Sequence, residues 1–233
     1  MNKLVTYQSQ ENYAVITINN GKANAISHEV ISGIHEGLHI AEKESKVVIL
    51  TGTEGVFSGG FDLSIMKKSP KDAIDLVTEG SKLSLRMLQF PLPIIIACNG
   101  HAIAKGAFLL LSSDYRIGVQ GNFKIGLNEV AIGMTMHNAG VAIARARLSE
   151  VYLNRSVINA EIYTPAVAIT AGFLDAIVQP EELLNTAIST AKLFGELNMA
   201  AHAKTKLKIR KPHLKALENG ILLDKKNSIR LNP

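Results

Sequence analysis

The sequence predicts an α/β fold built on a parallel β-sheet, and three observations support this prediction. Residues 47–50 and 94–98 are apolar throughout, as in strands that are buried on both faces of a sheet. Segments with helical periodicity alternate with these runs along the chain instead of forming a separate block. No repeat, low-complexity tract or linker divides the 233 residues, so we expect one large domain.

The N-terminal elements follow from their apolar patterns. Segments 4–7 and 13–18 alternate apolar and polar residues, which predicts an antiparallel hairpin. Ser27 can cap a helix that extends to about residue 44, because apolar residues then recur on one face. The first buried strand, 47–50, follows this helix and leads into the glycine-containing stretch 57–62.

The remaining elements are predicted in the same way. A helix is expected over 71–88, before the second buried strand, because Pro91 and Pro93 cannot continue it. Thr164 followed by Pro165 is typical of a helix start, and Gly172 of its end. The other predicted elements are an apolar helix at 107–111, strands at 115–119 and 123–125, and amphipathic helix from about residue 181 onward.

Composition is typical of a globular protein, with 47% hydrophobic and 19% charged residues. The single cysteine, Cys98, excludes an internal disulfide and fits a reducing compartment. No apolar run is long enough to span a membrane, and the N-terminus lacks the apolar segment of a signal peptide. We therefore expect a cytoplasmic protein with no membrane partner. No Cys, His or Asp cluster has the spacing of metal ligands, so no metal site is expected.

Positive charge is concentrated near the C-terminus. Between residues 204 and 230, nine basic residues accompany two acidic ones, Glu218 and Asp224. Such a run can meet a polyanion, such as nucleic acid or a phosphorylated cofactor, but more often it is a solvated helix face. Aromatic residues do not interleave with it, which counts against single-stranded nucleic acid. The basic residues are Lys204, Lys206, Lys208, Arg210, Lys211, Lys215, Lys225, Lys226 and Arg230.

A glycine-bearing turn follows each buried strand: 58–61 after the first and 104–107 after the second. Ligands of open α/β sheets sit beyond the carboxyl ends of strands, and glycine lets the backbone approach them. Free N–H groups that converge from two such turns form an oxyanion hole. On glycine alone, ordinary turns are the favoured interpretation of both segments. Neither turn matches a phosphate loop or a dinucleotide fingerprint.

Four stretches together resemble the enoyl-CoA hydratase/isomerase (crotonase) family, in the family's order and at similar spacing. They are 57–63, then 93–102 followed by Gly106 and 114–116, then 123–133, and finally 171–183. The resemblance implies a ClpP/crotonase-like spiral of ββα units with a C-terminal helical region. It implies a core domain over 1–195. Residues 196–233 would then be a basic helical segment that covers the site or joins subunits, in a homotrimer or hexamer.

The resemblance also assigns roles to individual residues. The backbone N–H groups of Phe61 and Lys105 would form an oxyanion hole around the thioester carbonyl of an acyl-CoA. Lys22 and Ala23 resemble the segment that lies along the CoA. The CoA belongs to the substrate, so no prosthetic group is expected. The other residues expected at the substrate are Ser58, Gly59, Gly60, Asp62, Leu63, Gly106, Phe108 and His137.

One of the two carboxylates that the family's hydratases use is missing. Glu129, in Asn128-Glu129, matches the first, but Phe108 stands where the second is expected. Adding water needs one group that holds and deprotonates the water and another that protonates carbon, whereas a single carboxylate can carry a proton from C2 to C4. The pattern therefore favours a Δ3,Δ2-enoyl-CoA isomerase, and apolar Phe108 would raise the pKa of Glu129.

Several alternatives stay open. The chain could be a hydratase with a single glutamate, or a non-catalytic homologue that binds acyl-CoA or RNA. Asp62 could be an acid at the cleft, although we favour a helix cap. His137 could be a second acid or base, but without an identifiable carboxylate partner we favour a pocket or surface position. The Lys105 side chain could reach the CoA phosphates, the mouth of the cleft or solvent.

Overall fold

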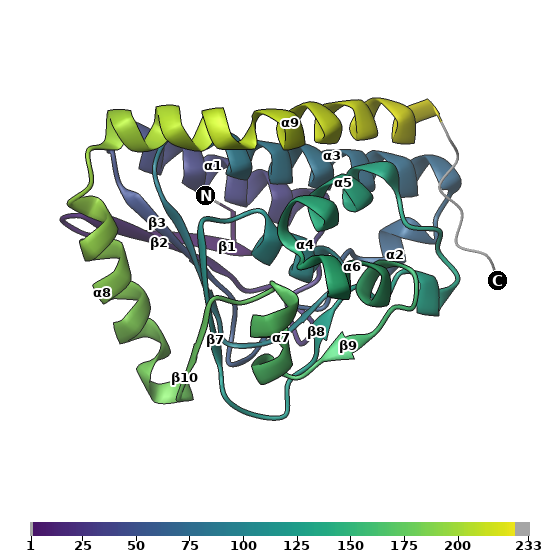
Figure 1. Cartoon of the computed structure of the whole chain (residues 1–233), viewed down its shortest axis with the longest axis horizontal. Coiled ribbons are helices and arrows are strands. Elements are labelled where there is room, and N and C mark those ends of the chain that lie inside the picture. Colours follow the sequence, from purple (N-terminus) through teal and green to yellow (C-terminus); the bar gives the residue numbers. More distant parts are fainter. Residues whose placement is uncertain (1, 227–233) are drawn as a thin grey trace.

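The computed structural model describes residues 2–226, and its main layer is a six-stranded sheet (Figure 1). The strand order is β1–β2–β3–β5–β7–β10, in which β1 and β2 are antiparallel and the other neighbours are parallel. The predicted hairpin and parallel sheet are therefore confirmed. The strands are β1 (Val5–Ser9), β2 (Tyr13–Ile18), β3 (Val47–Thr51), β5 (Ile94–Cys98), β7 (Tyr115–Val119) and β10 (Ala176–Val178).

A second, smaller sheet was not predicted, although the strand expected at 123–125 overlaps one of its strands at Ile125. Its order is β4–β6–β8–β9, with parallel pairs except between β8 and β9. The prediction that the two glycine turns follow the buried strands β3 and β5 directly is wrong, because β4 and β6 intervene. Strands of two to four residues are too short to show an apolar alternation. They are β4 (Gly55–Ser58), β6 (Gly100–Ile103), β8 (Ile125–Gly126) and β9 (Ile162–Tyr163).

Helices cover both faces of the main sheet. Helices α1 (His28–Lys43) and α3 (Pro70–Gln89) lie on one face, and α8 (Leu183–Gly195) covers the other (Figure 1). The side chain of Ser27 accepts a hydrogen bond from the N–H of Val30, so the predicted cap of α1 is confirmed. The fully apolar strands β3 and β5 thus contribute side chains to a separate core cluster on each side.

Helices α4 and α7 connect the two sheets, whereas α5 and α6 lie between strands β8 and β9 of the second sheet. Helix α7 begins at Pro165 after Thr164 and ends at Gly172 in a left-handed conformation, as predicted. Helices α5 and α6 were not predicted. The segments are α2 (Leu63–Met66), α4 (Lys105–Leu111), α5 (Asn138–Arg147), α6 (Glu150–Val157), α7 (Pro165–Ala171) and α9 (Met199–Lys226), with 3-10 turns η1 (Val130–Ile132) and η2 (Pro180–Glu182).

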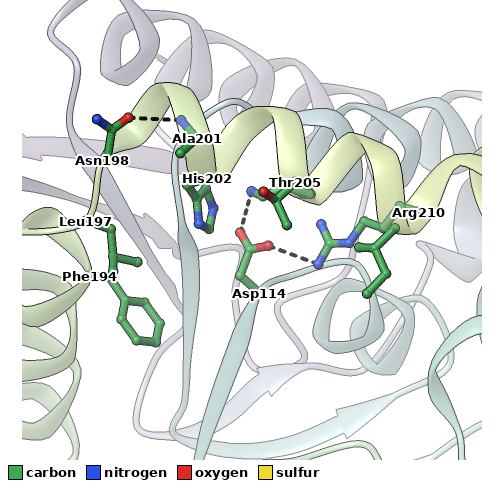
Figure 2. Close-up of a pocket in the computed structure, with 10 residues that line it drawn as sticks. Asp114, Phe194, Leu197, Asn198, Ala201, His202, Thr205 and Arg210 are labelled. Atoms are coloured by element: carbon green, nitrogen blue, oxygen red, sulfur yellow. Dashed lines mark hydrogen bonds and ion pairs between the residues drawn. The ribbon is translucent and has the colours of Figure 1, made fainter.

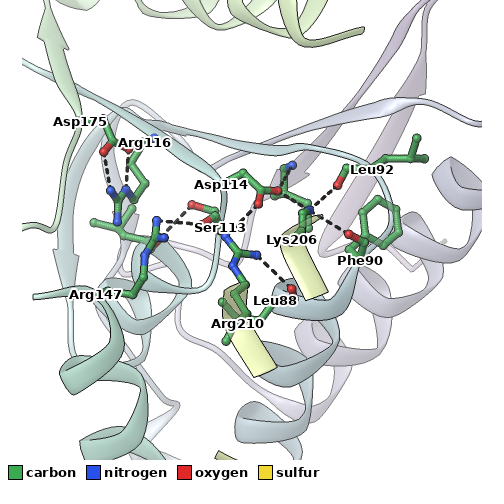
Figure 3. Close-up of polar contacts among 12 residues, drawn as sticks. Leu88, Phe90, Leu92, Ser113, Asp114, Arg116, Arg147, Asp175, Lys206 and Arg210 are labelled. Atoms are coloured by element: carbon green, nitrogen blue, oxygen red, sulfur yellow. Dashed lines mark hydrogen bonds and ion pairs between the residues drawn. The ribbon is translucent and has the colours of Figure 1, made fainter. Parts of the chain in front are cut away.

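The long C-terminal helix α9 lies along α3 and α5 of its own chain (Figure 1). Lys206 is buried and donates to the carbonyls of Phe90 and Leu92 and to Asp114 (Figure 3). Arg210 forms an ion pair of 2.9 Å with the other carboxylate oxygen of Asp114. Two residues of the basic run are therefore used inside the fold. Arg230 lies outside the described residues, and the exposed basic residues of α9 are Lys204, Lys208, Lys211, Lys215, Lys225 and Lys226.

A second ion pair connects two of the four stretches that carry the family resemblance. Arg116 on β7 donates through Nη2 and Nε to the carboxylate of Asp175, just before β10, at 2.5 and 2.7 Å (Figure 3). It also donates to the carbonyl of Gly172. The polar residues of those stretches thus fasten the edge of the main sheet. No helix among residues 2–226 is long and apolar enough to cross a membrane.

Candidate active site

The two glycine turns lie side by side at one end of the second sheet. Strands β4 and β6 are parallel neighbours, so both turns follow carboxyl ends that lie at the same end of the sheet. A Cβ atom on Gly60, where φ is +104°, would lie 2.9 Å from the Cβ of Ala104 and 3.4 Å from the nitrogen of Lys105. A Cβ on Gly106 would lie 2.3 Å from the carbonyl oxygen of Ser58. Glycine at these two positions is what lets the turns touch.

Each turn presents a backbone N–H group that has no partner among residues 2–226. The carbonyl of Gly60 and the N–H of Asp62 both bond to Ile26, so the N–H of Phe61 between them points the other way. Lys105 is the first residue of α4, where backbone N–H groups have no partner inside the helix. Within residues 2–226, neither N–H donates to another group. Two unpaired donors on touching turns have the arrangement of an oxyanion hole.

Glu129 follows strand β8, whose carboxyl end lies at the same end of the second sheet as the two turns. The N–H of Ala104, next to Lys105, donates to the carbonyl of Gly126 at 3.0 Å. Glu129 follows Gly126 by three residues and is 2% exposed. Its Oε2 atom has no hydrogen-bond partner among the described residues. Burial raises the pKa of Glu129 from 4.5 to about 7, the direction that the sequence predicted, so the carboxyl group can take up and release a proton near neutral pH.

Phe108 and His137 pack together one helical turn into α4. The ring of Phe108 is buried and meets the His137 ring edge-on, with 5.5 Å between centroids. His137 is 6% exposed, so the surface position considered for it is wrong. Burial lowers its pKa to about 4, which keeps the imidazole neutral at pH 7. The nearby carboxylate that the sequence did not identify is Asp224, which raises this pKa only in part.

The Lys105 side chain takes none of the three directions considered from the sequence. It is 2% exposed and points into the protein, where Nζ donates to the carbonyl of Gly80 and the hydroxyl of Ser84. The prediction that it reaches the CoA phosphates, the mouth of the cleft or solvent is therefore wrong. Its backbone N–H and its side chain serve different purposes.

Two polar side chains at the first turn, Ser58 and Asp62, stabilise its local structure, whereas Leu63 is exposed. Ser58 is buried and its hydroxyl accepts from the N–H of Gly60 and donates to the carbonyl of Asn24, so it shapes the turn. Asp62 caps α2 by accepting from the N–H of Ser64 at 2.8 Å, which confirms the favoured cap. Leu63, at the start of α2, is 46% exposed.

Lys22 and Ala23 are exposed next to this turn. The carbonyl of Ala23 accepts from the N–H of Gly59 at 2.7 Å, which places the 22–23 segment beside the first turn. Asn24, which was not singled out from the sequence, is fully buried. Its side chain donates to the hydroxyl of Thr53 and the carbonyl of Val56, and its positive φ of 44° is one local sign of a special role.

An apolar hollow of about 470 Å³ is lined by residues between 130 and 136, which follow Glu129 in the chain, and by two residues at the end of α6. Because its walls are mostly aliphatic or thioether side chains, it suits an acyl chain better than a charged group. Within residues 2–226, no group of three or more His, Cys, Asp or Glu side chains is placed to hold a metal ion. The lining residues of the hollow are Val130, Gly133, Met134, Thr135, Met136, Val157 and Ile158.

A second pocket, of about 490 Å³, lies elsewhere, between α8 and α9 (Figure 2). None of the predicted site residues lines it. Among the described residues, its one carboxylate, Asp114, is paired with both cations of the lining, Lys206 and Arg210. These charged groups already have partners within the fold, and the second sheet remains the candidate active site.

Comparison with known proteins gives the same assignment over nearly the full chain. The family model for enoyl-CoA hydratase/isomerase matches residues 8–231. An enoyl-CoA hydratase/isomerase family protein from Pseudomonas syringae is 54% identical, with a TM-score of 0.95 over 97% of this chain and 98% of that one. An apo enoyl-CoA isomerase from Mycobacterium tuberculosis is 36% identical, with a TM-score of 0.93 over 97% of this chain and 100% of that one.

A short-chain-enoyl-CoA hydratase from Clostridium acetobutylicum is 30% identical over 188 residues, which is 78% of this chain and 72% of the relative. Names of both reactions thus occur among proteins similar to this chain. Because the family match spans nearly the whole sequence and the structural agreement covers 97% of the residues, the chain belongs to the enoyl-CoA hydratase/isomerase family and has the crotonase fold.

Proposed function

We propose that this protein is an acyl-CoA isomerase that converts 3-enoyl thioesters into 2-enoyl thioesters. The observation that carries the proposal is the buried carboxyl group of Glu129, which has a pKa of about 7 and lies three residues after a strand that is hydrogen-bonded to the second turn of the oxyanion hole. Phe108 occupies the place where a second carboxylate would be needed for efficient addition of water. The name of the apo enoyl-CoA isomerase from Mycobacterium tuberculosis, at 36% identity, agrees with this choice, although a second structure of that protein names it a probable enoyl-CoA hydratase.

The reaction needs only one proton carrier. The ionised Glu129 removes a proton from C2, and the electron pair moves into the thioester carbonyl to form a dienolate. The N–H groups of Phe61 and Lys105 stabilise the negative oxygen of this intermediate. Protonated Glu129 then returns the proton to C4, so the C3=C4 bond is lost, a C2=C3 bond forms and the carboxylate is regenerated.

The raised pKa of Glu129 suits this proton transfer in both directions. A carboxylate with the ordinary pKa of about 4.5 would be ionised at pH 7 but would be a weaker base towards the C2 proton. A pKa of about 7 balances the ionised form, which removes the proton, against the protonated form, which returns it. Burial of Glu129, which is the main cause of the shift, also keeps solvent protons from competing.

The decisive experiment supplies the purified protein with 3-enoyl-CoA and, separately, with 2-enoyl-CoA, and follows both products over time. We expect rapid formation of 2-enoyl-CoA and little 3-hydroxyacyl-CoA. Glu129→Gln should lower the isomerase rate by about 10²–10⁴-fold, since it removes the proton carrier. Glu150→Gln, at an exposed position on α6, is the matched control and should have no effect. Turnover of the 2-enoyl substrate alone, to the 3-hydroxy product, would identify a single-glutamate hydratase instead.

The proposal extends to the form in which the protein works. The substrate brings its own CoA, so no prosthetic group is needed, and the Lys22–Ala23 segment beside the first turn is the proposed CoA contact. We propose a homotrimer or hexamer from the family resemblance, and a cytoplasmic location from the single cysteine, which fits a reducing compartment. Sedimentation at a mass equal to one chain would contradict the assembly.

A further inference from the structure

The side chain of Lys105 connects the oxyanion hole to helix α3. From its position at the start of α4 it reaches across to α3, where Nζ donates to the carbonyl of Gly80 at 2.6 Å and to the hydroxyl of Ser84 at 2.7 Å. Ser84 is itself fully buried. Burial lowers the pKa of Lys105 to about 7, so placing this amine inside the protein costs stability. A lysine whose side chain lay at the surface would avoid this loss of stability.

The same side chain also contacts the other half of the hole. Nζ lies 5.9 Å from the centre of the Phe61 ring. A Cβ on Gly80 would lie 2.5 Å from two atoms of that ring and 3.2 Å from Cε of Lys105. The ring and the lysine chain therefore share the space that Gly80 leaves open on α3. The Lys105 side chain thus lies beside the ring of Phe61, the other residue whose backbone N–H group belongs to the hole.

The turn that precedes Lys105 is strained. Ala104 has φ 51° and ψ −119°, a conformation that L residues rarely adopt and that glycine adopts easily. Strain of this kind persists only where the surrounding structure opposes relaxation. Relaxation of Ala104 would turn the N–H of Lys105 away from the hole, because that N–H belongs to the same peptide unit. The side chain of Lys105, which follows Ala104 directly, opposes this rotation because its Nζ is held by two hydrogen bonds to α3.

We propose that the Lys105 side chain is a positioning residue, which ties both N–H donors of the oxyanion hole to helix α3 and holds them aimed at the thioester oxygen. The inference rests on the proposed function in needing an acyl-CoA thioester as ligand, but it holds equally for isomerisation and for hydration. It assigns the side chain no contact with the substrate. It also explains why a long polar residue is tolerated at a position where the family resemblance leads one to expect a small one.

The test compares two ligands that differ only at the atom that the hole binds. Binding of a saturated acyl-CoA thioester and of its thioether analogue, which has CH₂ in place of the carbonyl, is measured by calorimetry. The wild-type protein should prefer the thioester. Lys105→Met keeps the length of the chain but removes the donors, and should abolish most of that preference while thioether affinity stays within about twofold. In the reaction, kcat should fall by about 10²-fold with KM changed far less, because small misplacements of aligned groups carry such penalties.

Three further variants keep the test independent of folding. Ser84→Ala removes one acceptor of Lys105 and should lower the thioester preference and kcat in the same direction, but less. Ser81→Ala, also buried on α3 and not an acceptor of Lys105, is the matched control and should leave both unchanged. Lys105→Arg retains donors and should restore part of the preference.

The outcomes separate the two proposals. A Lys105→Met protein that folds and keeps the full wild-type preference and kcat would overturn the positioning role, and so would an unaffected Ser84→Ala protein. A wild-type protein with no preference for the thioester would instead contradict the oxyanion hole, and with it the proposed function.

Discussion

Asp224 accepts a hydrogen bond of 2.7 Å from the backbone N–H of Asn138, which lies 86 residues earlier in the chain. The other carboxylate oxygen accepts from the N–H of Ala139 at 2.9 Å. These are the first two N–H groups of α5, and a negative charge is favourable at that end of a helix. Gly220, one turn earlier on α9, permits the close approach, since a Cβ there would lie 2.8 Å from the nitrogen of Ala139. The C-terminal helix α9 thus caps the N-terminus of α5, which begins directly after His137 in the chain.

Replacing this cap should destabilise the whole chain. Asp224→Ala leaves two helix N–H groups unpaired at a buried site, so we expect the free energy of unfolding to fall by about 2 kcal/mol. Urea denaturation measures the change. Glu218→Ala, at an exposed position on the same helix, is the control and should cost less than about 0.5 kcal/mol. Equal losses of unfolding free energy in the two variants would mean that the hydrogen bonds from α5 to Asp224 do not stabilise the fold.

Phe108→Glu tests whether a missing carboxylate limits hydration. A carboxylate at this position would supply the second group that water addition requires, so the variant should form 3-hydroxyacyl-CoA from 2-enoyl-CoA faster than the wild type. The variant should also be less stable, since a buried charge replaces a ring that packs against His137. Product analysis by chromatography measures the rate. Phe108→Gln should show the same loss of packing without the gain in hydration; a gain in both variants would exclude acid–base chemistry as its cause.

The pH dependence of activity should report the ionisation of Glu129. Because the ionised form removes the C2 proton, kcat/KM should rise with pH and level off above a pKa of about 7. His137, with a pKa of about 4, should contribute no ionisation between pH 6 and 8. Initial rates across pH 5–9 test this. A rise centred near the ordinary glutamate value of 4.5 would show that Glu129 is not the base or is not desolvated in solution.

Glu129 should also make the protein less stable as the pH rises. Its pKa in the folded state, about 7, lies above its unfolded value of 4.5, so the folded state binds the proton more tightly. Stability is therefore lost between pH 4.5 and 7, by roughly 3 kcal/mol at most. Glu129→Gln removes this term, and its stability relative to the wild type should increase over that range. Urea denaturation at pH 4.5 and pH 8 compares them; a constant difference would contradict the buried, raised pKa.

The buried pair between Lys206 and Asp114 leads to a prediction about the basic helix. Lys206→Met removes a partner of Asp114 and leaves the carbonyls of Phe90 and Leu92 without their donor, so we expect a loss of about 3 kcal/mol. Lys208→Met, at an exposed position two residues further along α9, should change stability by less than about 0.5 kcal/mol. Similar small effects of both would mean that Lys206 is solvated in the folded protein.

Much of the fold could be predicted because its determinants are local. The apolar runs of β3 and β5, the Ser27 cap and the Thr164-Pro165 helix start each depend on neighbouring residues, and the structure has all of them. The second sheet escaped prediction because its strands are too short to show a period, and only pairing between distant segments makes them strands. Helices α5 and α6 escaped for a related reason: they are short, and few of their side chains are buried.

The sequence by itself determined which groups are available: two glycine turns, a single glutamate at position 129, and a phenylalanine at 108 in place of a second carboxylate. Only the tertiary structure decided how those groups behave. The contact between the turns, the pKa of Glu129, the inward course of the Lys105 side chain and the cap that Asp224 provides all depend on residues far apart in the chain. Burial and long-range hydrogen bonding are properties of the folded packing, whereas residue identity and local period are properties of the chain.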